Sequence, residues 1–103
     1  MTVQIIVQAE AESDLHEAYR WYEARRTGLG DEFIAEADQT FARIIEAPLR
    51  PRVQHRGSRR VRLHRFPYVV VYLARGDRAY ILAVLHERRN PRLFHARVRD
   101  SDG

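Results

Sequence analysis

The sequence contains no cysteine, which excludes disulfides, thiolate metal sites and a cysteine nucleophile. This absence is typical of proteins from a reducing compartment. No apolar run approaches the roughly 18 residues that a membrane-spanning helix needs. Residues 1–4 lack the basic start of a signal peptide, and no apolar signal core follows them. We therefore expect a cytoplasmic protein that makes no membrane contact.

Glycine and proline are scarce, at five and four residues, and neither forms a repeat. Hydrophobic residues make up 45% of the chain and charged residues 31%, which excludes a disordered or collagen-like protein. A chain of 103 residues has room for one core of useful size. We expect a single domain over residues 1–103.

Lysine is absent as well, and arginine supplies all eighteen basic residues apart from histidine. Residues 1–47 hold four arginines and ten acids, whereas residues 48–99 hold fourteen arginines and two acids. A cationic half of this kind attracts an anionic partner. That partner is nucleic acid, an acidic protein segment or the acidic half of the same chain.

Hydrophobic periodicity in the first half predicts a strand followed by two helices. Residues 3–7 form a short run rich in β-branched side chains, as in a strand. Residues 11–47 carry apolar side chains at helical spacing. Glycines at 28 and 30 mark a turn, so residues 11–47 read as a helical hairpin that ends before Pro48. The apolar residues that we expect to pack the hairpin on a sheet are Leu15, Tyr22, Ile34, Phe41 and Ile45.

The second half has the period of β-strands. Polar and apolar side chains alternate over residues 59–64, which places Val61 and Leu63 on one face of a half-buried strand. The other face carries a basic row, formed by Arg60, Arg62 and His64. Such a row of arginines suits phosphate or carboxylate recognition, and the alternative is a solvated strand face.

Two apolar runs follow, at residues 66–73 and 79–85, and a turn at residues 75–77 makes them a hairpin. The expected order is β-α-α-β-β-β. The predicted fold class is therefore α+β, with the N-terminal helical hairpin packed on one face of a mainly antiparallel four-stranded sheet. From the sheet, we expect the hairpin to meet Val70, Tyr72, Ile81 and Ala83, or their alternating neighbours.

The residues that are candidates for chemistry are few. His86 ends the last apolar run beside a cationic segment, where it serves either as a general acid or base or as a structural histidine. The five histidines have no metal-ligand spacing, and the chain has no phosphate-binding glycine loop or nucleophile elbow. We expect neither a metal nor a cofactor.

The C-terminal half contains two short motifs, R-F-P-Y at Arg65–Tyr68 and H-x-R-R-x-P at His86–Pro91. They are preceded in order by Asp14-Leu15, Trp21-Tyr22, Gly28-Leu29-Gly30 with Phe33, Pro48, and Val61-Arg62. From about Asp14 to Arg97, the chain thus resembles the RelE/ParE toxin superfamily of bacterial type II toxin-antitoxin modules. The fold of that superfamily, two N-terminal helices on an antiparallel sheet, agrees with the architecture predicted above.

The resemblance favours the ParE-like branch, whose members look like inhibitors of DNA gyrase without catalytic residues. It implies growth arrest, a role in plasmid stabilization and neutralisation by a cognate ParD-like antitoxin in a hetero-oligomer. No catalytic residue is expected in this interpretation. The residues predicted to bind the antitoxin or the target are Arg60, Arg62, His64, Arg65, Arg88, Arg89, Arg92 and Arg97.

Two alternatives stay open. A RelE-like, metal-independent endoribonuclease would cut messenger RNA on the ribosome, and its candidate catalytic residues are His64, His86 and Arg88. The matching positions Val69 and Phe94 are hydrocarbon side chains, which neither neutralise a phosphate nor deliver a proton. The other alternative is a non-toxic module whose basic face binds an acidic helix.

Overall fold

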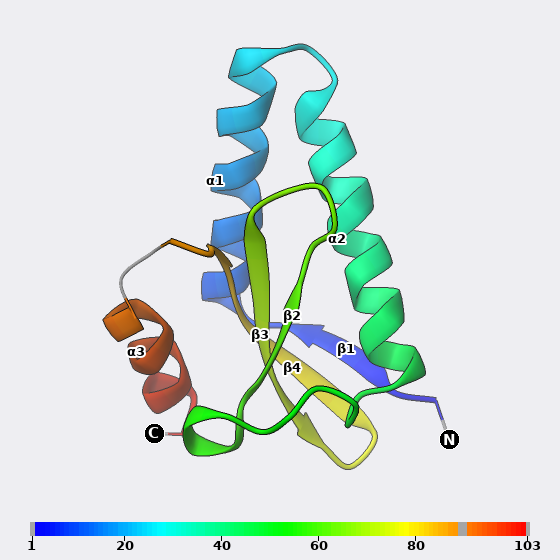
Figure 1. The fold of residues 1–103 in the computed structure, drawn as a ribbon, viewed down its shortest axis with the longest axis vertical. Coiled ribbons are helices and arrows are strands. Elements are labelled where there is room, and N and C mark those ends of the chain that lie inside the picture. Colours follow the sequence, from blue (N-terminus) through cyan, green and yellow to red (C-terminus); the bar gives the residue numbers. More distant parts are fainter. Residues whose placement is uncertain (1, 89–90, 103) are drawn as a thin grey trace.

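The computed structural model describes residues 2–88 and 91–102, with side chains through Arg99. Along the chain it contains β1 (Gln4–Val7), α1 (Ala9–Arg25), α2 (Leu29–Glu46), η1 (His55–Gly57), β2 (Arg59–Arg62), β3 (Tyr68–Arg75), β4 (Arg78–His86) and α3 (Pro91–Asp102) (Figure 1). The α+β class and the order β-α-α-β-β-β are confirmed. The helix α3 is an addition that the sequence analysis missed. None of the described helices is long and apolar enough to cross a membrane.

The four strands form one sheet in the order β1-β4-β3-β2. β1 runs parallel to β4, and the other two pairings are antiparallel, so the expected mainly antiparallel sheet is confirmed. The hairpin of β3 and β4 closes where Arg75 faces Arg78. Gly76 has a φ of 60° in this turn, a conformation that glycine adopts at little cost.

The helical hairpin turns sharply at its two glycines. Gly28 has a φ of 92°, and a Cβ at Gly30 would lie 2.7 Å from the backbone oxygen of Tyr19. Only glycine therefore allows α1 and α2 to approach so closely here. The Glu23 carboxylate accepts hydrogen bonds from the N–H groups of Gly28 at 2.9 Å and Gly30 at 3.0 Å, which satisfies donors that the start of α2 leaves unpaired.

The hairpin packs on one face of the sheet, around the buried side chains of Phe33 and Ile44. Four of the five helix residues expected there pack against this core, namely Leu15, Tyr22, Ile34 and Phe41. The expectation for Ile45 is wrong, because that side chain is 38% exposed. Ile44, one position earlier on the helix, turns inward in its place.

A bulge in β4 changes which residues face the hairpin. Val71 pairs with Ala83 whereas Tyr72 pairs with Ile81, so Leu82 is an extra residue in this register. Val70, Tyr72 and Ile81 lie in the hairpin-facing core as expected. Beyond the bulge, Val84 faces the hairpin, and Ala83 lies in a second cluster on the opposite side.

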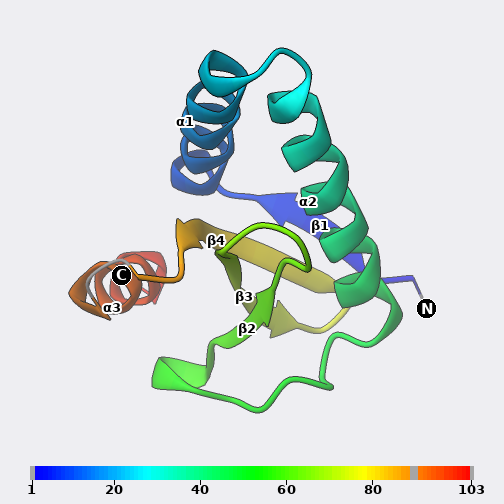
Figure 2. The ribbon, with the colours of Figure 1, turned by 45° about the horizontal axis from the view of Figure 1, so that its top comes forward.

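That second cluster is covered by α3. Phe94 and Val98 of α3 are buried against residues of β3 and β4 that include Val71, Leu73 and Leu85. Figure 2 shows α1 and α2 on one side of the sheet and α3 on the other. The sheet therefore has helices on both faces, and its basic row lies beside a helix instead of facing only solvent.

Candidate functional site

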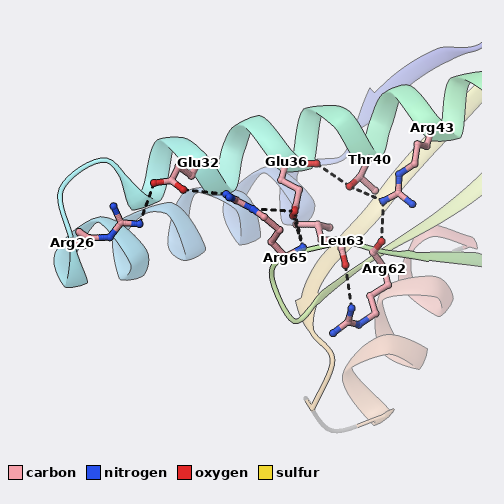
Figure 3. Close-up of polar contacts among 8 residues, drawn as sticks. All are labelled: Arg26, Glu32, Glu36, Thr40, Arg43, Arg62, Leu63 and Arg65. Carbon is pink, nitrogen blue, oxygen red and sulfur yellow. Dashed lines mark hydrogen bonds and ion pairs between the residues drawn. The ribbon is translucent and has the colours of Figure 1, made fainter.

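A buried carboxylate on α2 holds the loop between β2 and β3 (Figure 3). The Glu36 side chain is only 7% exposed, and its two oxygens accept hydrogen bonds from the backbone N–H of Arg65 at 2.7 and 2.8 Å. A carboxylate removed from water needs such donors to offset the lost hydration. Glu36 therefore fixes the place where the R-F-P-Y segment begins.

The Arg65 side chain continues this contact along α2. Its guanidinium donates to Glu32 at 3.1 Å and lies 3.8 Å from a Glu36 oxygen. The hydrogen bond from Arg65 is the main cause that holds the pKa of the Glu32 carboxyl below its usual range. Arg26 donates to the other Glu32 oxygen at 3.1 Å, so cations and carboxylates alternate along this edge of the hairpin (Figure 3).

Arg62 is the last residue of β2, and its side chain binds Glu87, which directly follows β4. Its Nε donates to Glu87 at 2.7 Å, and this hydrogen bond is the first cause that lowers the pKa of the Glu87 carboxyl. The backbone oxygen of Arg62 accepts a hydrogen bond from Arg43 of α2 at 2.9 Å. The Arg62 side chain is still 55% exposed, so a further anion has access to it.

Arg60, the other arginine of the basic row, lies against α3. Its guanidinium carbon is 4.6 Å from the centre of the Phe94 ring, a cation–π distance. The Nε atom of Arg60 is buried and has no hydrogen-bond partner among the described residues. Packing on Phe94 therefore determines where the charge of Arg60 lies.

Arg97 joins the two halves of the chain. Its guanidinium binds both oxygens of Asp14 at 2.7 and 2.8 Å and donates to the backbone oxygen of Leu82 at 3.1 Å. Asp14 also accepts a hydrogen bond from the N–H of Val84 at 3.0 Å. The two charged side chains are 17% and 10% exposed, so this pair connects α1, β4 and α3 in a largely buried position.

A cavity of about 480 Å³ opens between α1 and the ends of β3 and β4. It is lined by apolar and aromatic side chains such as Trp21 and Tyr68, with His86 among them. The Nδ1 atom of His86 accepts a hydrogen bond from the N–H of Arg88 at 3.2 Å, and its ring lies edge-on to Tyr68 at 5.5 Å. His86 therefore lines the cavity from the end of β4, where its ring accepts a hydrogen bond from the turn that follows the strand.

The family model of the ParE toxin of the type II toxin-antitoxin system parDE matches residues 5–91. The chain belongs to the ParE toxin family. A solved structure of the chromosomal ParDE toxin-antitoxin system from P. aeruginosa has the same fold, with a TM-score of 0.73 and 15% sequence identity. The match covers 82% of this chain and 95% of the other. The search of curated proteins found no match.

In this ParE-family chain, the two candidate catalytic histidines do not converge. His64 is exposed on the loop after β2, where it lines a hollow of about 420 Å³ with Glu32 and Arg65. His86 lines the other cavity, beside α1. Arg88 is exposed after the end of β4. The two histidines thus lie in different pockets.

The remaining predicted binding residues are dispersed. Arg92 is exposed on α3, and Arg89 lies outside the described residues. No group of three or more potential metal ligands occurs within residues 2–88 and 91–102. The sequence analysis missed Asp14 and Glu36 as partners of Arg97 and Arg65. One signal for Glu36 was available, because Glu32 and Glu36 are four residues apart on one side of a helix in the acidic half.

Proposed function

We propose that this protein is the toxin of a ParDE-type module and that it arrests growth by binding DNA gyrase in the cytoplasm. The observation that carries the proposal is the family match over residues 5–91. The turn from Gly28 to Gly30 and the R-F-P-Y segment at Arg65–Tyr68 resemble the ParE-like branch, and that resemblance supplies gyrase as the target.

Inhibition by binding, without catalysis, is supported by the arrangement of the candidate residues. A metal-free ribonuclease needs a base, an acid and free cations around one phosphate. Here His64 and His86 line different pockets, and Arg62 is paired with Glu87. Phe94 is buried beneath Arg60 and has no proton to transfer.

The proposed partner is a ParD-like antitoxin that neutralises the toxin. Its tail lies as a helix across the groove of α1 and α2 and continues as an extended segment against the sheet. The cavity beside Trp21 and Tyr68 accommodates an apolar side chain of that tail. Its carboxylates meet Arg60 or Arg62 of the basic row, or Arg65 beside it, in keeping with the charge division of the chain.

Expression without antitoxin, followed by purification and a gyrase assay, tests the proposal. We expect growth arrest, induction of the DNA-damage response and inhibition of supercoiling by the purified protein. The variant His86→Ala should retain both activities, because no step of the proposed inhibition transfers a proton. Its melting temperature serves as the control for folding, since the ring contact with Tyr68 is lost.

A different result would identify one of the alternatives. Rapid translation arrest with ribosome-dependent cutting of messages, reduced by about 10²- to 10⁴-fold in a folded His86→Ala variant, would establish the ribonuclease. Growth without arrest at high expression would favour the other alternative, a non-toxic binding module. Either result overturns the gyrase proposal.

A further inference from the structure

Cationic side chains gather where η1 meets α3. The rings of His55 in η1 and His95 in α3 stack with their centres 4.1 Å apart and their planes at 24°. The charged groups that act on His55 are His95, Arg56, Arg60 and Arg99, which come from η1, β2 and α3. These five residues are called the basic face below.

The charges around His55 are of one sign, since every described charged group that shifts the pKa of His55 is a cation. Arg56 and Arg99 of the basic face are exposed, so an anion has access to them. Burial is the largest cause that lowers the pKa of His55, and these cations lower it further. The basic face thus concentrates positive potential, which an anion would relieve.

The geometry of α3 extends this face along one side of the helix. Arg92, His95 and Arg99 are separated by three and four residues, so they share one side of α3, and all three are exposed. Phe94 and Val98 on the other side are buried against the sheet. Two helical turns place the backbone of Arg92 and Arg99 about 10 Å apart. The exposed side of α3 is therefore a row of cations.

The turn in η1 directs Arg56 of the basic face to the same region. Arg56 has a φ of 53°, in the left-handed region that residues with a side chain rarely adopt. The turn is closed by hydrogen bonds from Gly57 N–H to the Gln54 oxygen and from Ser58 N–H to the His55 oxygen. A strained conformation that the surrounding structure maintains at an exposed arginine is a common feature of binding sites.

We propose that the basic face binds the phosphate backbone of double-stranded DNA without regard to base sequence. Guanidinium groups suit phosphate oxygens, and DNA offers charges at regular intervals to a row of cations. An acidic peptide is the other ligand that a cluster of arginines recognises, and apolar anchors would strengthen its docking. The exposed residues of the row on α3 are all polar, and the apolar residues Phe94 and Val98 are buried. This inference goes beyond gyrase binding and does not depend on it.

Protonation of His55 gives the site a characteristic pH dependence. In the free protein, the pKa of His55 lies below the ordinary value of 6.5, so His55 is neutral at physiological pH. A phosphate beside the His55 ring favours its charged form and raises that pKa again. DNA binding is then coupled to proton uptake, and the affinity rises as the pH falls toward 6.5 and below.

Fluorescence anisotropy with the full chain and a short labelled duplex tests the proposal in the absence of gyrase. The variant Arg56→Gln/Arg99→Gln should bind at least about tenfold more weakly, and the slope of log affinity against log salt should fall by about 2. The matched control is Arg75→Gln/Arg78→Gln, which removes the same charge at the β3–β4 turn. It should change the affinity by less than about threefold.

The histidines are tested separately. The parent should bind more tightly at about pH 6 than at about pH 8, and His55→Gln/His95→Gln should abolish that gain. Equal losses in the two arginine variants, or no pH dependence in the parent, would overturn the proposal. So would a polyglutamate peptide that binds at least as tightly as DNA through Arg56 and Arg99, because the face would then be a site for an acidic protein.

Discussion

Single residues in this protein hold together parts of the chain that are far apart in sequence. Glu36 is the clearest case, since it binds the backbone of Arg65, which lies 29 residues further along the chain. Sequence periodicity identified α2 and its apolar side, but periodicity carries no information on which loop a buried carboxylate meets. The same limit explains the error at Ile45, where the edge of the apolar stripe was taken as core.

Replacing Glu36 by alanine should destabilise the protein by about 1 to 3 kcal/mol, because the N–H of Arg65 loses its acceptor. Chemical denaturation measures this change as a lower free energy of unfolding. Glu32→Ala is the matched control, since it removes a carboxylate that binds the same arginine from a more exposed position. The control should lose clearly less stability, because exposed ion pairs contribute little. Equal losses would contradict a special role for Glu36.

At the scale of elements, the sequence predicted β1, the helical hairpin and the three later strands but not α3. The stretch with Arg88, Arg89, Arg92 and Arg97 was interpreted only as a cationic binding segment. Six of the nine residues 91–99 are not large and apolar, which obscures the helical period. Pro91 at the first helical position was an available signal, as was the spacing of Phe94 and Val98. The bulge at Leu82 was not predictable, because alternation alone gives no sign of an inserted residue.

The ion pair of Asp14 and Arg97 is expected to anchor α3 to the rest of the fold. Asp14→Asn leaves a largely buried guanidinium without its counter-charge and should cost about 3 to 5 kcal/mol of unfolding free energy. Hydrogen exchange should show the largest loss of protection in α3 and at Val84, whose N–H donates to Asp14.

A double-mutant cycle provides the control for this anchor. Asp14→Asn/Arg97→Gln should cost less than the sum of the two single changes, because the second change removes the charge that the first leaves unpaired. Strict additivity would show that the two side chains contribute independently. A loss below about 1 kcal/mol in Asp14→Asn would show that the pair adds little to stability.

For the whole molecule, the division of charge along the sequence has two consequences. Part of it is used internally, since acids of the first half bind arginines of the second half, Glu32 and Glu36 with Arg65 and Asp14 with Arg97. The sequence analysis named the chain's own acidic half as one possible partner, and these pairs confirm that option. Arginines that stay exposed, such as Arg62, are available to a second molecule. Composition predicted the attraction but gave no means of assigning each arginine to a partner.

The exposed charges of Arg62 and Arg65 are expected to recognise carboxylates of the proposed antitoxin. Arg62→Glu/Arg65→Glu should weaken antitoxin binding by at least about tenfold at low salt, and the difference should shrink as salt screens the charges. Both arginines remain more than half exposed although each already binds a carboxylate of its own chain, so a partner's carboxylates have access to them. Isothermal titration calorimetry over a salt series measures the effect.

Two further variants separate recognition from folding. Arg75→Glu/Arg78→Glu makes the same change of charge at the β3–β4 turn and should affect antitoxin binding far less. Arg62→Gln/Arg65→Gln removes the positive charges without placing new carboxylates beside Glu32, Glu36 and Glu87, so it should fold normally and show an intermediate loss of affinity. An affinity at low salt that is the same for the parent and for both Arg62/Arg65 variants would contradict this prediction. In that case the antitoxin recognises another surface, and the proposed contact of its carboxylates with Arg62 and Arg65 is wrong.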